Sequence, residues 1–237
     1  MKQKDNLEIG EVPLFHKKNI LKYKGTIALE MGAGQSLLQN IFLRQYLDYQ
    51  YLIDIFPMLS ISKVNRVLEK YKLEKIKNFN QLKPYNIEYR APCDLIHEEG
   101  LENRGINFFL SSSTFEHIPV EDLKEILEKL MKILIEGSYL SLHIDYSDHL
   151  SHQDPNCGRN HFLQYSDQQW NKYNTWVIYQ NRLRHDHYKK MFIETGFEII
   201  EEEAKNFCDL PKNVDSKLLT GSENDLATTG RWVLKKN

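Results

Sequence analysis

Residues 26–34 read TIALEMGAG, and they carry the strongest fold signal in the chain. The first six residues are mostly apolar and follow Gly25, which is typical of a buried β-strand. Gly32 and Gly34 then permit a sharp turn, and residues 35–46 carry apolar side chains at helical spacing. The stretch therefore predicts a strand, a glycine turn and a helix N-terminus, an arrangement that lets a ligand approach the backbone closely.

The alternation of strand and helix continues along the chain. Further strands are expected at 51–56, 87–90, 106–112, 139–144, 197–203 and 228–234, and helices at 60–72, 120–135 and 183–195. Strands joined by helices of this length pair in parallel through right-handed crossovers, so we expect an α/β three-layer sandwich. No linker separates two bodies. We therefore expect a single domain over residues 1–237, with a regular half at about 24–145 and an insertion at about 146–182.

Charge and cysteine content exclude several classes of protein. The 237 residues include 31 Lys+Arg and 33 Asp+Glu, which gives a net charge of -2 and argues against nucleic acid as a partner. The three cysteines are more than 50 residues apart, which argues against a disulfide framework or a zinc ribbon. The chain has no apolar run of about 18 residues and no signal-peptide core at its start. We expect a cytoplasmic protein without a transmembrane segment, and the oligomeric state stays open.

An acidic residue after the second strand indicates the ligand. Asp54 lies 20 residues after Gly34, where a carboxylate can accept both hydroxyls of a ribose. The third glycine of a dinucleotide fingerprint would fall at Leu37, and no GxxxxGK[ST] loop exists. Glu30, just before the glycines, favours a cationic ligand over a pyrophosphate because like charges repel. S-adenosylmethionine has an ammonium group, a sulfonium and no phosphate, and it meets these requirements.

Three blocks in order, at 26–34, 51–59 and 106–145, resemble the successive motifs of the class I S-adenosylmethionine-dependent methyltransferases. The resemblance covers about residues 24–145, with a looser match as far as 203. It implies a Rossmann-like, seven-stranded, mostly parallel sheet with an antiparallel last strand. Two positions depart from the family pattern, since Ser36 replaces a motif glycine and Asn107 replaces an acidic residue.

The same resemblance implies a cofactor, S-adenosyl-L-methionine, with S-adenosyl-L-homocysteine as the product. The methionine moiety would lie against Glu30 and the two glycines, the ribose against Asp54, and the adenine near Asp94. Two serines would close the pocket at the end of the fourth strand. The implied cofactor-binding residues are Glu30, Gly32, Gly34, Asp54, Asp94, Leu95, Ser112 and Ser113.

Residues 143–188 resemble, more narrowly, a branch often found among bacterial surface-polysaccharide biosynthesis proteins. That resemblance implies O-methylation of a sugar or of a sugar-linked phosphate-type oxygen, with a nucleotide-sugar, a glycan or another small molecule as acceptor. Three alternatives stay open. They are a small-molecule methyltransferase outside glycan metabolism, a non-catalytic S-adenosylmethionine-binding module, and a nicotinamide-dependent sugar reductase. Tyr71 and Lys75 have the spacing of the reductase pair but lie between the wrong strands.

Histidines mark the candidate catalytic region, because six of the nine fall between residues 143 and 188. A sugar hydroxyl is a poor nucleophile near neutral pH, so a general base accelerates its methylation. The predicted base is His149, or His143 paired with Asp145 on one side of a strand. His117 is a further candidate. The irregular spacing of these residues matches no established ligand pattern, so no metal is predicted.

Two arginines and several aromatic residues are the candidate acceptor contacts. Arg182 and Arg184 carry guanidinium groups suited to bidentate binding of phosphate or carboxylate. Together with His152 and Tyr179 they form the predicted substrate-binding set. Aromatic residues also recur at three-residue spacing, which predicts either a packed helical face or a platform for a sugar ring. They are Trp170, Tyr173, Trp176 and Tyr179.

Overall fold

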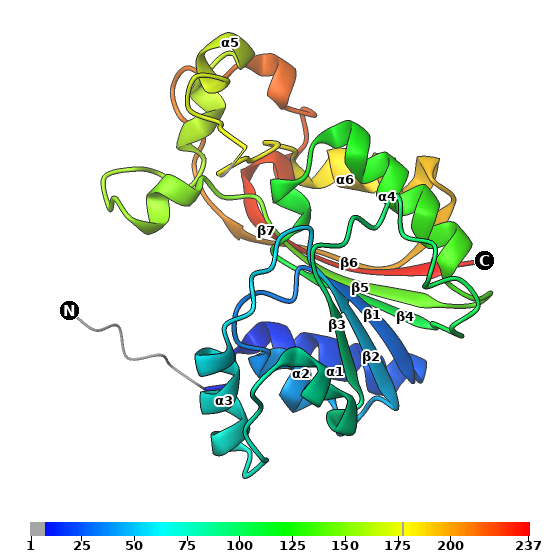
Figure 1. Cartoon of the computed structure of the whole chain (residues 1–237). Coiled ribbons are helices and arrows are strands. Elements are labelled where there is room, and N and C mark those ends of the chain that lie inside the picture. The colour runs from blue at the N-terminus through cyan, green and yellow to red at the C-terminus, as the bar shows by residue number, and fades with distance from the viewer. Residues whose placement is uncertain (1–7, 177) are drawn as a thin grey trace. The chain divides into compact units, whose positions relative to one another are not determined.

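The computed structural model describes residues 8–176 and 178–237, so residues 1–7 and 177 of the predicted domain and insertion lie outside it. Within these ranges seven strands form one sheet in the order β3-β2-β1-β4-β5-β7-β6 (Figure 1). Strand β1 pairs in parallel with β2 and β4, β2 pairs in parallel with β3, and β6 and β7 are antiparallel. The predicted α/β class, with a seven-stranded, mostly parallel sheet, is confirmed. The strands are β1 Ile27–Met31, β2 Tyr49–Ile53, β3 Ile87–Arg90, β4 Phe108–Ser112, β5 Tyr139–Asp145, β6 Phe197–Phe207 and β7 Ala227–Lys236.

Six α-helices occur in the described ranges, and three of the longer ones lie where the sequence predicts them. The helices are α1 Glu11–Tyr23, α2 Leu38–Leu43, α3 Ile61–Lys70, α4 Val120–Ile133, α5 Asp167–Trp170 and α6 His185–Glu194. Helix α2 is shorter than predicted, because Leu37 before it has a left-handed φ of 57°. None of the helices in the described part of the chain is long and apolar enough to cross a membrane.

The chain divides into two compact units, and each is described by itself. The first comprises residues 1–111 and 132–141, and the second comprises 112–131 and 142–237. The predicted division at residue 145 into a cofactor half and an insertion stays a prediction.

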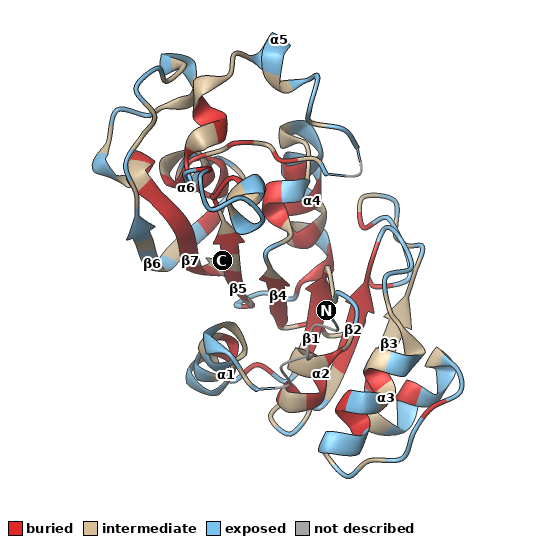
Figure 2. Cartoon of the chain, turned by 90° about the vertical axis from the view of Figure 1, so that its left-hand side faces the viewer, coloured by how far each residue is buried: buried red, intermediate tan, exposed pale blue. Residues whose placement is uncertain are grey.

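Helices α1, α2 and α3 lie beside strands β1 to β3 in the first unit (Figure 1). Apolar residues of α2 and α3 share one buried cluster with Leu52 of β2 and Ile87 of β3. Ile20 of α1 joins Ala28, Phe108 and Leu110 in a second cluster. Figure 2 shows β1 and β2 mostly buried and β3 mostly of intermediate burial, with exposed residues on the outer sides of the helices. This packing holds the glycine turn between β1 and α2 on a rigid support.

Aromatic residues pack together in the second unit. Helix α6 packs against β6 and β7, and His185 stacks on Trp232 of β7 with ring centroids 4.1 Å apart. Helix α5 ends at Trp170, and residues 171–176 form turns and irregular structure. The three-residue aromatic spacing therefore does not mark a helical face. Trp170 instead donates from Nε1 to the Gln180 carbonyl, 3.2 Å away.

Candidate functional site

The glycine turn of the first unit has the backbone conformation that its sequence requires. Gly32 and Gly34 have φ angles of 84° and 71°, in the left-handed region that favours glycine. The Gly32 amide donates to the Ile53 carbonyl at 3.0 Å, which ties the turn to the end of β2. A Cβ added at Gly34 would meet no atom within 4 Å. Backbone conformation rather than crowding selects glycine there, and the turn leaves space for a ligand.

Asp54 follows β2 and carries a buried oxygen that no group satisfies. The Tyr89 hydroxyl and the Ala33 amide donate to the carboxylate, whereas Oδ2 has no hydrogen-bond partner among the described residues. Burial raises the pKa of Asp54 to about 6. A buried acceptor without a donor costs about 1–3 kcal/mol, so a hydroxyl supplied by a ligand would be stabilising. The residues present therefore fit the ribose of an adenosine-type cofactor.

Glu30 is anchored to the start of α2. Its side chain is 2% exposed, and it accepts from Gln39 Nε2 at 2.8 Å and from Asn40 Nδ2 at 2.5 Å. Burial, together with the nearby Asp54 carboxylate, raises the pKa of Glu30 to about 8. These contacts fix the glycine turn relative to the helix. The contact of Glu30 with a methionine moiety stays a prediction.

The other predicted cofactor residues are distributed over both units. In the first unit, Asp94 accepts from the Ile96 amide at 3.0 Å and lies 3.1 Å from His97 Nδ1, and Leu95 is buried. Ser112 and Ser113 belong to the second unit. There the Ser113 amide donates to the His143 carbonyl at 2.8 Å, and its hydroxyl lies 3.2 Å from His143 Nδ1.

The Asp145 carboxylate lies close to several histidines in the second unit. Asp145 Oδ1 accepts from the amide and the hydroxyl of Ser147, at 2.9 and 2.6 Å. Its Oδ2 lies 3.7 Å from the Nε2 atoms of both His149 and His152. The His117 ring lies next to that of His149, with centroids 4.8 Å apart. The structure thus brings together Asp145 and three of the predicted histidines.

Burial affects the ionisation of this cluster. The pKa of His149 is lowered, first by burial and then by the neighbouring His117. Its Nε2 atom is buried and has no hydrogen-bond partner among the described residues. The His149 imidazole is therefore neutral near pH 7, which is the form that can accept a proton.

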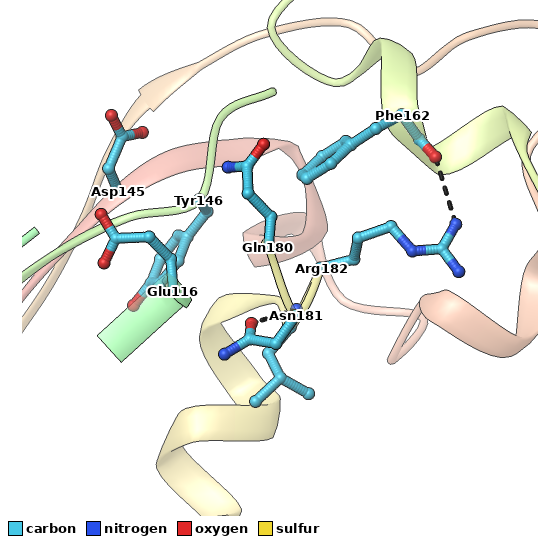
Figure 3. A pocket seen from close by; sticks show the side chains of 8 residues that line it. Glu116, Asp145, Tyr146, Phe162, Gln180, Asn181 and Arg182 are labelled. Carbon is cyan, nitrogen blue, oxygen red and sulfur yellow. Dashed lines mark hydrogen bonds between the residues drawn. The ribbon is translucent and has the colours of Figure 1, made fainter. Parts of the chain in front are cut away.

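Glu116 is the site residue that the sequence interpretation missed. It is 3% exposed, and neither carboxylate oxygen has a side-chain hydrogen-bond partner in the described part of the chain. Its carboxyl group lies near that of Asp145 (Figure 3). Burial and the Asp145 charge raise the pKa of Glu116 well above its usual range. The available signal was the Phe115-Glu116-His117 sequence, which stands where the family that the chain resembles often has an aliphatic-Glu-His turn.

Glu116 and Asp145 line a small hollow that is closely filled by its own side chains. Its wall also includes residues 180–183, at the end of the predicted insertion (Figure 3). The two carboxyl groups give the hollow an acidic end. Two neighbouring carboxyl groups attract positive charge and repel anions.

The two arginines are occupied inside the second unit. Arg184 is fully buried and donates to Asn160 Oδ1 and to the carbonyls of Tyr146, Asp225 and Ala227. Arg182 is 5% exposed and donates to two carbonyls and to Asp167. Neither guanidinium group is free to hold an anionic acceptor, so the prediction for these two residues is corrected.

Comparison with known proteins adds the fold family. No family model and no curated protein matches the sequence. A methyltransferase structure from Clostridium acetobutylicum matches with a TM-score of 0.59 and 11% identity, over 98% of this chain and 93% of that one. The fold is that of the class I S-adenosylmethionine-dependent methyltransferases.

Two further structures of this fold differ in the atom that they methylate. The N-methyltransferase NodS from Bradyrhizobium japonicum, in complex with S-adenosyl-L-homocysteine, matches with a TM-score of 0.53 and 11% identity, over 100% of this chain and 93% of that one. The carbon methyltransferase CurJ matches with a TM-score of 0.53 and 15% identity, over 94% of this chain and 54% of that one. At such identities the methyltransferase fold is shared, whereas the acceptor differs between its members.

Proposed function

We propose that the chain is an S-adenosylmethionine-dependent O-methyltransferase that acts on a sugar or on a sugar-linked phosphate-type oxygen in surface-polysaccharide biosynthesis. The cofactor assignment rests on the buried Asp54 oxygen that has no donor, beside an open glycine turn in a methyltransferase fold. The acceptor class is supported by the resemblance of residues 143–188 to the polysaccharide branch. All three cysteines are free, which is usual in the cytoplasm, where we place the reaction.

The cofactor would supply a methyl group on a positively charged sulfur. Asp54 would accept a ribose hydroxyl, and the backbone between Gly32 and Gly34 would lie against the methionine part. The second unit would hold the acceptor and remove its proton. Positioning of this kind contributes up to about 7–11 kcal/mol to catalysis, and a general base adds about 10²–10⁴-fold.

Two histidines are candidates for the proton acceptor. His149 has an unpartnered, neutral Nε2 atom 3.7 Å from Asp145, whereas His143 is oriented by Ser113. We expect His143→Ala to lower kcat by at least about 100-fold if this residue is the base, with the dissociation constant for the cofactor unchanged. A single-turnover assay and a binding titration on the same variant separate the two effects.

The cofactor assignment is tested by calorimetry with S-adenosyl-L-homocysteine. Saturable binding supports the assignment, and no binding at millimolar concentration would refute it. The acceptor is then found by incubating labelled cofactor with nucleotide-sugars and phosphosugars and following product masses. Because NodS methylates nitrogen, an aminosugar belongs in the same set, and N-methylation would replace the proposed O-methylation.

A further inference from the structure

Glu116, His117 and His149 form a cluster of side chains that can bind a metal ion, and a general-base role for one histidine does not account for this cluster. One donor atom from each side chain lies within 4.8 Å of the other two, and all three residues belong to the second unit. Glu116 is buried, His117 is exposed and His149 is intermediate, so the group runs from the interior to the surface. A small ion could therefore reach the buried carboxylate from the exposed side of this group.

The buried carboxylate is the unusual member of this group. Glu116 is 3% exposed, no side chain donates a hydrogen bond to either oxygen, and no lysine or arginine within the described ranges forms an ion pair with it. The only nearby charge that acts on it is the carboxylate of Asp145, which has the same sign. A buried carboxylate without a neighbouring cation is costly, so a ligand that supplies positive charge would stabilise it.

Each of the two histidines has a ring nitrogen that can bind a metal ion. His117 Nδ1 lies 2.8 Å from the Tyr179 carbonyl oxygen. A carbonyl only accepts, so Nδ1 carries the proton and Nε2 has the lone pair that binds metals. His149 Nε2 is buried and has no hydrogen-bond partner among the described residues. Two imidazole nitrogens and one carboxylate form a donor set suited to a divalent transition metal.

Residues 179–181 hold the donor groups in place. The Tyr179 carbonyl orients His117, and the Gln180 side chain accepts from the His149 amide at 3.1 Å. Asn181 donates from its amide to the Glu116 carbonyl at 2.9 Å, and from its side chain to the carbonyls on either side of the turn. One short segment therefore positions all three side chains, as expected for the outer shell of a metal site.

Two other groups of metal-binding side chains in the described structure lack these features. In the first, Cys157 donates to Asp148, whose other oxygen accepts from the Leu150 amide. In the second, Glu202 already binds His185 and Lys189. The carboxylates of these two groups already have side-chain partners within the protein, whereas the carboxylate of Glu116 has none among the described residues.

We propose that Glu116, His117 and His149 bind one divalent transition-metal ion, such as Zn²⁺ or Mn²⁺, on the solvent side of the buried carboxylate. Three protein ligands leave coordination positions for water or for the oxygen atoms of an acceptor. A site of this kind lowers the pKa of a coordinated hydroxyl group, so His149 acts as a metal ligand and not as the base. This catalytic role rests on the proposed function, whereas metal binding does not.

The test begins with the full-length protein after chelator treatment and dialysis. Calorimetric titration with ZnCl₂ and, separately, MnCl₂ is expected to give one bound ion per chain for at least one metal. Glu116→Gln and His149→Asn are each expected to weaken binding by at least about tenfold. Cys157→Ser is the matched control, because it disables the neighbouring metal-binding group, and it should bind the ion as the wild type does.

Two outcomes would overturn the proposal. One is the absence of stoichiometric binding of either ion to the wild type. The other is binding that is lost in Cys157→Ser and kept in Glu116→Gln. If a variant does not fold, the Co²⁺ spectrum of the wild type replaces it, since a sulfur-to-cobalt charge-transfer band would assign the ion to Cys157. Binding of S-adenosyl-L-homocysteine is measured on the same samples, so failure of the metal site and failure of the cofactor assignment are distinguished.

Discussion

Asp54→Ala should abolish most of the affinity for the cofactor while leaving the fold intact. The Asp54 Oδ2 atom is buried without a donor, and a ribose hydroxyl would supply one. A hydrogen bond to a charged group contributes about 1.5–3 kcal/mol, so the dissociation constant for S-adenosyl-L-homocysteine should rise by about 10- to 150-fold. Isothermal titration calorimetry at pH 7.5 measures this change. Asp48→Asn, at an exposed position just before β2, is the control for a lost negative charge.

The pH dependence of the same titration tests the physical cause. The pKa of Asp54 is raised by burial to about 6, so the carboxyl group is ionised at pH 7 and mostly protonated at pH 5. The ribose requires the ionised form, and the affinity of the wild type should therefore fall about tenfold between pH 7 and pH 5. Asp54→Asn should lack this dependence. It should also be more stable than the wild type by about 1 kcal/mol or more at pH 7 without ligand, because burial of the charge is removed.

The argument about Asp54 fails if Asp54→Ala binds S-adenosyl-L-homocysteine within twofold of the wild type. It also fails if Asp54→Asn keeps the tenfold loss of affinity at pH 5. Circular dichroism of each variant ensures that only folded protein enters the comparison.

Three further predictions concern stability and are measured by urea unfolding. The folded-state pKa of Glu30 is about 8 against an ordinary value of 4.5, so this group lowers the unfolding free energy by about 1.4 kcal/mol per pH unit between pH 5 and 8. Glu30→Gln should remove this contribution from the slope of the wild type, and an unchanged slope in the variant contradicts the assignment. Arg184→Met should lower the unfolding free energy by about 3–5 kcal/mol because buried carbonyls lose their donors, and Arg184→Lys should cost less; equal stabilities for Met and wild type would refute this. Gly25→Ala should cost about 1–3 kcal/mol, because its Cβ would lie 2.6 Å from buried Phe108, while Gly158→Ala, with open space around it, is the control.

The sheet could be predicted because its strands are short apolar runs bounded by turn residues. Asp54 and the glycine turn followed from their positions at the ends of such runs. Helix α1 was not predicted, since its buried face includes His16 and Asn19, whose polarity hides the helical pattern. The Ser141 hydroxyl lies 2.8 Å from His16 Nδ1 and accepts from Asn19 Nδ2 at 2.8 Å, contacts that only the folded chain reveals.

The metal-binding group and the arginines were hidden for a related reason. Glu116, His149 and the segment 179–181 are separated by more than 30 residues, so no local spacing links them. The charge of Arg184 suggested an exposed anion-binding side chain. Burial instead follows from the carbonyls that surround it, and burial lowers the pKa of Arg184 to about 10. The sequence indicates which side chains have the chemistry to bind a ligand. The fold decides which of them already have partners within the protein.

The Arg184 guanidinium has one more consequence, which concerns how this protein could be re-engineered. Three of its acceptors are main-chain carbonyls, at Tyr146, Asp225 and Ala227. Every amino acid offers the same carbonyl, so the side chains at those three positions can change without loss of the attachment. Substitutions near these positions should therefore leave the Arg184 attachment intact, as long as they spare the buried side chains of Tyr146 and Asp225, which make hydrogen bonds of their own. Residues that contact the acceptor could then change during engineering while Arg184 keeps these segments attached to one another.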